Sequence, residues 1–192
     1  MAEQTEHKGR IVIISGPSGV GKSTISREVA KQLPDTYLSI SATTRPKAEG
    51  EVDGRDYWFI TREEFERRIE QGRMLEYAEV FGHLYGTPRD KVEEALKAGK
   101  TVILEIDVQG ARQAKAKYPD ATMIFILPPR QRDLADRMLR RGREHGEQAV
   151  KRLNHAGAEI AAAWQYYENM VINDDLEQAV SEVVQIIKQK KS

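Results

Sequence analysis

The octet GPSGVGKS occupies residues 16–23, directly after the apolar run Ile11 to Ile14 and directly before a stretch with helical periodicity. The short β-branched run predicts a buried strand over 10–15, and apolar residues at four-residue steps predict a helix over 22–33. A glycine-rich turn between such elements points backbone N–H groups and the positive end of the helix at one place. The octet also fits G-x-x-x-x-G-K-[ST], which predicts a loop that binds the phosphates of a nucleoside triphosphate.

Within this loop, Lys22 can reach the β- and γ-phosphates, and the Ser23 hydroxyl can coordinate Mg²⁺. The alternative is a glycine-rich turn that binds nothing, but a strand before it and a helix after it favour the phosphate loop. The candidate ATP-binding residues here are Gly16, Pro17, Ser18, Gly19, Val20, Gly21, Lys22, Ser23 and Thr24. The motif does not indicate which molecule receives the phosphoryl group.

Composition narrows the class of protein. A length of 192 residues suits one domain with insertions, and 30 basic residues against 30 acidic ones argue against a general binder of nucleic acid. The chain has no cysteine, its first ten residues are polar, and it lacks an apolar run of the roughly 20 residues that cross a bilayer. We therefore expect a soluble cytoplasmic protein without a membrane or nucleic-acid partner, whose oligomeric state the sequence leaves open.

Strands and helices are expected to alternate along most of the chain. Predicted strands cover 37–41, 57–60, 75–80, 83–85, 101–107, 122–127 and 170–172, and predicted helices cover 61–72, 87–98, 108–117, 130–141, 148–167 and 175–190. Thr61 opens a capping box, and Thr87-Pro88 has the composition of a helix start. Alternation predicts a parallel sheet with helices on both faces, and the stretch from 41 to 86, with a polar loop or hairpin over 42–56, looks like an inserted lobe.

Asp107 stands at the carboxyl end of a predicted buried strand, with Glu105 two residues earlier on the same strand face. Ligands of open parallel sheets bind beyond this edge, so Asp107 could hold Mg²⁺ through a water molecule. It could equally be the N-cap of the helix over 108–117, and the two roles are compatible.

The acceptor is suggested by the inserted lobe. A GTP switch would need an N-K-x-D segment, which the sequence lacks, whereas a phosphorylated acceptor is already an anion and needs positioning and charge neutralisation more than a general base. Groups suited to an anionic, aromatic acceptor are Ser41, Arg45, Tyr57, Glu76, Tyr85 and Thr87. Taken singly, each also fits a structural role, such as an exposed strand carboxylate, a half-buried aromatic or a helix cap.

At these residues the chain closely resembles the guanylate kinase family. The resemblance is carried, in order, by SGPSGVGKST, S-x-T-T-R at 41–45, G-E-V-D-G-R-D-Y at 50–57, L-E-Y-A at 75–78, Y-G-T at 85–87, I-D-V-Q-G at 106–110 and I-N-D-D-L at 172–176. It implies ATP + GMP ⇌ ADP + GDP with Mg²⁺, in purine nucleotide metabolism. It also implies an α/β fold: a three-layer α/β/α P-loop domain over 9–192 with a parallel core sheet (about 9–40, 88–128 and 168–192), a small mixed GMP-binding lobe (about 41–87) and a helical lid (about 129–150).

The resemblance also implies residue roles. One carboxylate, Glu76, would accept both N1–H and the N2 amine of guanine, with the Ser41 and Thr87 hydroxyls at the remaining base edge. Arg45, Tyr57 and Tyr85 would hold the GMP phosphate, and Asp107 would complete the GMP-binding set. Asn173 would lie near the ATP nucleoside. The residues implied in catalysis are Lys22, Arg45, Arg137, Arg141 and Arg152.

One position departs from the family pattern. Many members carry a second phosphate-binding arginine three residues after the first, where this chain has Ala48. Lys47 could supply a charge there, though as a point rather than a planar fork. Two other functions remain open at this stage: a non-catalytic guanylate kinase-like interaction module, and a P-loop kinase for another phosphorylated small molecule.

Overall fold

Strand β1 (Arg10–Ser15) leads through the glycine-rich octet into helix α1 (Lys22–Gln32), as predicted. Ile11 to Ile14 are all buried in β1, as expected for a strand inside a sheet. The structure, a computed structural model, describes residues 9–130 and 147–189. The chain divides into two compact units, one of Met1–Val12 with Asp35–Ala121 and the other of Ile13–Pro34 with Thr122–Ser192.

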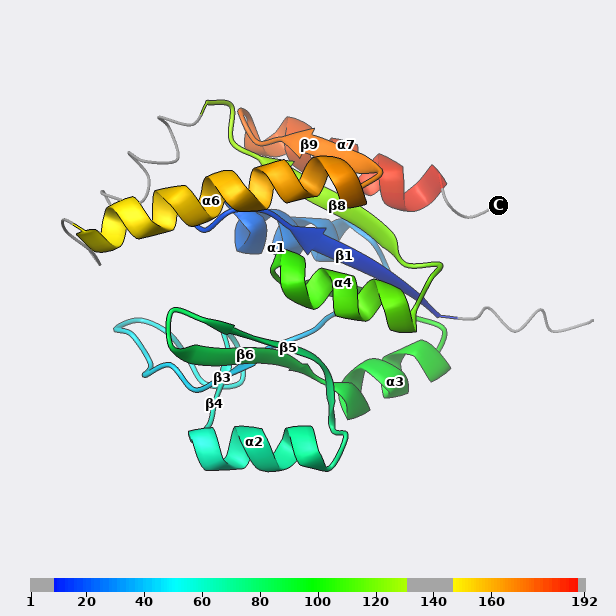
Figure 1. Cartoon of the computed structure of the whole chain (residues 1–192). Coiled ribbons are helices and arrows are strands. Elements are labelled where there is room, and N and C mark those ends of the chain that lie inside the picture. Colours follow the sequence, from blue (N-terminus) through cyan, green and yellow to red (C-terminus); the bar gives the residue numbers. More distant parts are fainter. Residues whose placement is uncertain (1–8, 131–146, 190–192) are drawn as a thin grey trace, which may run out of the picture. The chain divides into compact units, whose positions relative to one another are not determined.

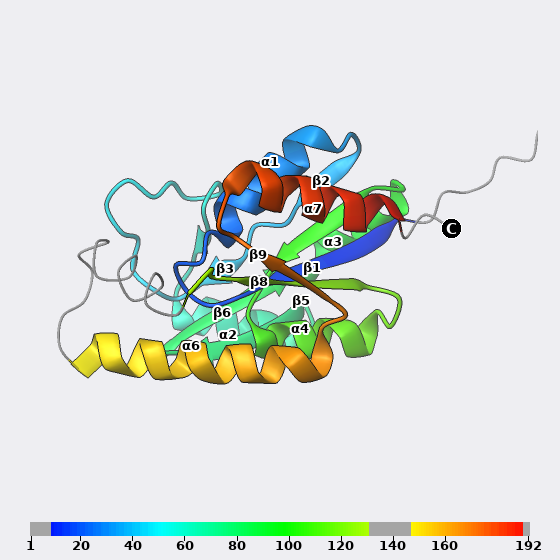
Figure 2. The ribbon, with the colours of Figure 1, turned by 90° about the horizontal axis from the view of Figure 1, so that it is seen from above.

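The second of these units contains α1, strands β8 (Thr122–Leu127) and β9 (Asn169–Ile172), and helices α6 (Glu147–Tyr166) and α7 (Leu176–Gln189). Strands β8 and β9 pair in parallel, from Ile124 opposite Asn169 to Leu127 opposite Ile172. Figure 2 shows these strands between α6 on one side and α1 with α7 on the other. Covered on both sides, β8 is apolar and buried along nearly its whole length.

In the first unit, β2 (Thr36–Leu38) pairs in parallel with β7 (Thr101–Glu105), and helix α3 (Arg89–Lys97) packs against β7. The strand order of the five-stranded sheet is β2-β7-β1-β8-β9. The predicted parallel core sheet is confirmed. Strand β2 is shorter than the predicted 37–41, although the N–H of Ser39 still donates to Ile103 O at 2.9 Å.

A second sheet occupies the predicted inserted lobe. Its order is β4 (Trp58–Phe59), β3 (Ala42–Thr43), β6 (His83–Pro88) and β5 (Met74–Val80), with β3–β4 parallel and the other pairs antiparallel. In Figure 1 this sheet lies between helix α2 (Arg62–Glu70) and helix α4 (Val108–Lys117). Phe65 of α2 packs with Ala42, Met74 and Leu84 in a buried cluster. The polar, glycine-rich stretch over 42–56 predicts a loop or hairpin, which is wrong for β3, since a strand of two residues is too short to show a period.

The capping signals near the lobe gave one correct and one wrong prediction. Thr61 is the N-cap of α2 and accepts a hydrogen bond from the N–H of Glu64, as the capping box predicted. Thr87 and Pro88, predicted to start a helix, instead end β6, and α3 begins at Arg89. The physical reason is strand pairing: Thr87 lies opposite Glu76 and Pro88 opposite Met74 in the β5–β6 ladder. Proline is tolerated at this position because the ladder is irregular opposite it: the register shifts between Met74 and Glu76, and prolines within sheets occur at such bulges.

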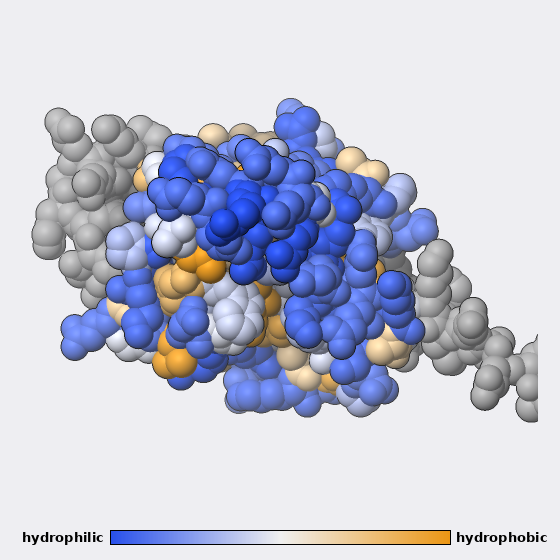
Figure 3. All heavy atoms as spheres, turned by 90° about the horizontal axis from the view of Figure 1, so that it is seen from below, coloured by the Kyte–Doolittle hydropathy of each residue, from blue (hydrophilic) through white to orange (hydrophobic). Residues whose placement is uncertain are grey.

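The mixed α/β class is confirmed, with a parallel core sheet and a separate mixed sheet. The predicted helix over 130–141 and most of the predicted lid fall on residues 131–146, outside the described part of the chain. Among the residues that the structure describes, no helix has the length and apolar character needed to cross a membrane. The face drawn in Figure 3 is largely hydrophilic, with hydrophobic residues showing in several smaller areas between the hydrophilic ones, in line with the 31% charged residues of the chain.

Candidate active site

The phosphate loop has the backbone that its glycines predict. Gly16 (φ 151°) and Gly21 (φ 103°) occupy conformations that other residues rarely adopt. A Cβ at Gly16 would also lie 2.5 Å from the Ile126 carbonyl oxygen, so a side chain there would displace β8. Gly21 is the N-cap of α1 and has no side chain to cap the helix, which leaves the first N–H groups of α1 to other acceptors. This is the geometry of an anion-binding helix terminus.

Lys22 lies directly against this loop. Its ammonium donates hydrogen bonds to the carbonyl oxygens of Gly16 at 2.5 Å and Pro17 at 3.1 Å. Ser23 and Thr24 follow in the first turn of α1 and are exposed. The loop therefore combines a fixed positive charge, a helix N-terminus and an exposed hydroxyl, the three groups that triphosphate binding requires.

Asn173, at the end of β9, braces the same loop. Its side chain is buried, and Nδ2 donates to Val20 O at 2.7 Å. Its backbone N–H donates to Leu127 O at 2.8 Å, which fixes Asn173 at the end of β8. A Cβ at Gly21 would lie 2.5 Å from Nδ2, so glycine is also required here for the close approach of Asn173. Loop support by Asn173 was not part of the sequence prediction, which placed it near the nucleoside.

Glu76 is a buried carboxylate in the first unit. It lies on β5 opposite Thr87 of β6, and the Thr87 hydroxyl donates to Glu76 Oε1 at 2.6 Å. Glu76 is 3% exposed and Thr87 0% exposed, so Glu76 is not the exposed strand carboxylate of the structural alternative. A buried carboxylate with few partners is costly, and such groups concentrate at functional sites.

Burial raises the pKa of the Glu76 carboxyl from 4.5 to about 7. The hydrogen bond from Thr87 opposes this rise, the nearby Asp107 carboxylate adds to it, and the charge of Lys117 lowers the pKa slightly. The unfolded chain ionises Glu76 near its ordinary pKa, whereas the folded chain does so near neutrality. The contribution of Glu76 to folding is therefore most favourable below pH 4.5 and declines as the pH rises through 7.

Glu76→Gln should consequently stabilise the protein more at alkaline than at acid pH. The variant has no carboxyl to ionise, so its free energy of unfolding relative to wild type should rise by about 2–3 kcal/mol between pH 5 and pH 8. Urea unfolding at several pH values measures this difference. Glu79→Gln, at an exposed position of the same strand, is the control for loss of a surface charge. A Glu76→Gln difference that stays constant with pH would contradict the raised pKa.

Asp107 lies close to Glu76 and is the N-cap of α4. Its Oδ1 accepts from the N–H of Gly110 at 2.7 Å, which confirms the capping role. Its Oδ2 is buried and, among the described residues, has no hydrogen-bond partner. Such an acceptor suits a donor from a ligand, either an N–H group or a metal-bound water. The geometry thus accommodates both roles that the sequence left open.

An arginine and two tyrosines form a second group in the same unit. The guanidinium carbon of Arg45 lies 5.5 Å from the ring centroid of Tyr57, and the Tyr57 and Tyr85 centroids are 6.0 Å apart. Burial raises the pKa of Tyr57 to about 12, so its phenol stays protonated and can donate a hydrogen bond. Positive charge and a hydroxyl donor together form a group that can bind a phosphate.

The sequence did not predict the partner of Arg45, which is Glu51. The two side chains form a two-pronged ion pair at 2.9 and 3.0 Å, and Glu51 also accepts from the N–H of Ala48 at 2.8 Å. Ala48 therefore contributes its backbone to this cluster, while Lys47 is exposed. No sequence pattern pairs two residues across an irregular loop, so only the fold could reveal Glu51.

The structure describes the remaining predicted site residues only in part. Ser41 directly precedes β3, which pairs with β6, the strand that carries both Tyr85 and Thr87. Arg152 lies in α6, although its side chain is outside the described part, as are Arg137 and Arg141 altogether. The first unit thus brings together Arg45, Tyr57 and Tyr85, and separately Glu76, Thr87 and Asp107.

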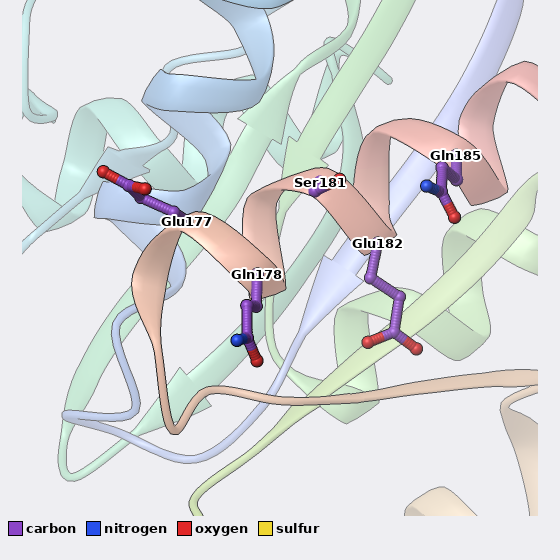
Figure 4. A pocket seen from close by; sticks show the side chains of 5 residues that line it. All are labelled: Glu177, Gln178, Ser181, Glu182 and Gln185. Carbon is purple, nitrogen blue, oxygen red and sulfur yellow. The ribbon is translucent and has the colours of Figure 1, made fainter.

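A hollow on α7 is lined by none of these residues. Figure 4 shows its lining side chains projecting from the helix: Glu177, Gln178, Ser181, Glu182 and Gln185. Two carboxylates and two amides give it no positive charge for a phosphate. We therefore assign it no part in nucleotide binding.

Comparison with known proteins identifies the family of the chain. The family model for guanylate kinase matches residues 8–190. A guanylate kinase from Carboxydothermus hydrogenoformans is 48% identical over 185 residues, which cover 96% of this chain and 90% of that protein, and one from Synechocystis is 47% identical with 96% of both covered. The crystal structure of guanylate kinase from Anaplasma phagocytophilum superimposes with a TM-score of 0.80 at 32% identity, covering 95% of this chain and 86% of that one. The chain therefore belongs to the guanylate kinase family.

Proposed function

We propose that this chain transfers the γ-phosphoryl group of ATP to GMP, forming ADP and GDP. The observation that carries the proposal is the buried Glu76 carboxylate, held by Thr87 at 2.6 Å. Guanine offers two adjacent donors, N1–H and the N2 amine, to one carboxylate. Adenine lacks that pair of donors, so binding it would leave the buried carboxylate unpaired, at a cost greater than that of one missing contact.

The GMP phosphate binds, in this proposal, to Arg45, Tyr57 and Tyr85. When GMP binds, Arg45 gives up its ion pair with Glu51 and binds the phosphate instead, because phosphate oxygens fit the same planar guanidinium group. Tyr57 donates its phenolic hydrogen. Ser41 hydrogen-bonds the base edge beside Thr87, and Asp107 Oδ2 accepts a donor from the bound nucleotide or its water.

The ATP phosphates bind the loop over 16–24. Backbone N–H groups and the N-terminus of α1 surround the β-phosphate, and Lys22 neutralises the charge that develops on the transferred group. Asn173 maintains the shape of the loop and borders the nucleoside. Arg137 and Arg141, in the part of the chain implied to be the lid (about 129–150), and Arg152, just after it, add positive charge that stabilises the transferred group.

Mg²⁺ fits this set of residues. Within the described ranges, no three His, Asp or Glu side chains gather as ligands, as expected of a magnesium site that relies on substrate phosphates. Ser23 would hold the ion directly, and Asp107 through water. When bound, Mg²⁺ neutralises phosphate charge during transfer.

The decisive experiment measures ADP release from ATP and Mg²⁺ with GMP, AMP, CMP or UMP offered separately. GMP should be used at least about a hundredfold more efficiently than AMP, because a site built around a base donor pair discriminates strongly. Equal rates with all four acceptors would indicate a different phosphorylated substrate. A protein inert towards all four would favour the interaction module.

A further inference from the structure

The first turn of α4 packs tightly against the Glu76 carboxylate. A Cβ built on Gly110, the third residue of this helix, would lie 2.2 Å from Glu76 Oε2 and 2.9 Å from its carboxyl carbon. The same atom would be 3.4 Å from Asp107 Oδ1. The first two distances are well inside van der Waals contact. The Glu76 carboxylate therefore fills the space that any other residue at position 110 would need for its side chain.

Backbone conformation does not explain the glycine. Gly110 lies in helical backbone and is absent from the positive-φ glycines of the described chain. Alanine has the higher intrinsic propensity at such a position. The hydrogen bond from Gly110 to Asp107 is donated by the backbone N–H, which any residue except proline provides. What glycine supplies here is room.

Two side chains on the same face of α4 as Gly110, those of Gln113 and Lys117, hold the strand that carries Glu76. Gln113 Nε2 donates to Tyr77 O at 2.6 Å, and its Oε1 accepts from the N–H of Tyr77 at 3.3 Å. Lys117 Nζ donates to Leu75 O. Strand β5 is an edge strand of its sheet, so these backbone groups are available to a helix. The residues on both sides of Glu76 are thus tied to α4.

These contacts leave the Glu76 carboxylate little freedom. Thr87 holds Oε1 from one side, Gly110 lies against Oε2, and the strand cannot move away from α4 without losing the bonds of Gln113 and Lys117. A methyl group at 110 would be accommodated most easily by rotating the carboxyl group, which is the flexible end of a side chain. That rotation would weaken the bond to Thr87 and turn the carboxylate away from its present orientation.

We infer that Gly110 is a positioning residue that determines specificity. Because it has no side chain, the Glu76 carboxylate can keep the orientation that the two guanine donors need. The inference rests on the proposed function of Glu76. It adds a residue that touches no substrate and acts entirely through Glu76. Its loss should weaken recognition of GMP and leave the ATP half of the reaction unchanged.

The test is Gly110→Ala, assayed with GMP and with AMP at saturating ATP and Mg²⁺. We expect the KM for GMP to rise about tenfold or more, since one misoriented buried hydrogen bond has about this effect. The KM for ATP should stay within about twofold, and the preference for GMP over AMP should fall. The midpoint of thermal unfolding should decrease by less than it does when a substitution disrupts the core. Gly157→Ala in α6, where a Cβ meets nothing within 4 Å, is the matched control and should change none of these values.

A double-mutant cycle with Glu76→Ala separates the clash from general damage. In that background there is no carboxylate to displace, so adding Gly110→Ala should cause no further loss in GMP binding, measured by kinetics or by calorimetry. If Gly110→Ala alone does not fold, recovery of folding in the double variant gives the same support. Equal losses in both backgrounds, or unaltered GMP kinetics in Gly110→Ala, would overturn the inference. If Glu76→Ala itself leaves the preference for GMP intact, the proposed function of Glu76 fails instead.

Discussion

Lys22→Ala is expected to reduce phosphoryl transfer by at least about a thousandfold, because a cation at the transferred group stabilises charge that develops only in the transition state. In the structure the Lys22 ammonium contacts the carbonyl oxygens of Gly16 and Pro17, so its charge is already placed at the phosphate loop. The loss should appear mainly in kcat. Steady-state kinetics with GMP and ATP measure it, and circular dichroism checks that the chain remains folded.

Lys31→Ala is the matched control for this variant. Lys31 lies on the same helix, its side chain is 70% exposed, and it pairs with Glu28 at the surface. Its removal should change turnover by less than about twofold, because exposed ion pairs contribute little. If Lys22→Ala turned over at the wild-type rate, the loop would take no part in the reaction and would be only a structural turn.

Glu76→Gln is expected to reduce the preference for GMP over AMP by about a hundredfold. The glutamine amide presents a donor where the carboxylate presented an acceptor, so one guanine donor faces another and is left unpaired in a buried site. The KM for ATP should change little. The measurement is the ratio of kcat/KM for GMP to that for AMP, and the Glu79→Gln variant is again the exposed control from β5.

The outcome also bears on stability. The same substitution should make the folded protein more stable at pH 8, because it removes the ionisation of a buried carboxyl whose pKa is raised to about 7. A more stable variant with poor discrimination would indicate that the buried carboxylate serves recognition at a cost in folding free energy. An unchanged GMP preference would show that another group recognises the base.

The sequence predicted those features that depend on near neighbours in the chain. The strand over 10–15, the loop over 16–23 and the helix after it follow from periodicity and from the dihedral angles that glycine allows. Helix α4 was predicted with its observed bounds, Val108–Lys117, and Asp107 was correctly predicted as its cap. The order of the quoted motifs also pointed to the guanylate kinase family, which the comparisons then showed.

Prediction was weakest where a local signal competed with a distant partner. Thr87-Pro88 has the composition of a helix start, but pairing with β5 keeps both residues in a strand. Strand β3 was missed because its two residues depend on neighbouring strands rather than on any pattern of their own. The roles of Arg137, Arg141 and Arg152 remain predictions.

The sequence by itself determined the phosphate loop, the α/β class and the family, because those rest on spacing and backbone preference within short segments. Only the tertiary structure decided that Thr87 holds Glu76, that Glu51 holds Arg45, and that Gly110 leaves room for a carboxylate. Arg45 and Glu51 meet across one irregular loop, whereas the other contacts join different elements, as do Gln113 and Tyr77, which are 36 positions apart. Whether two such side chains meet depends on strand register and helix packing, which no local pattern encodes.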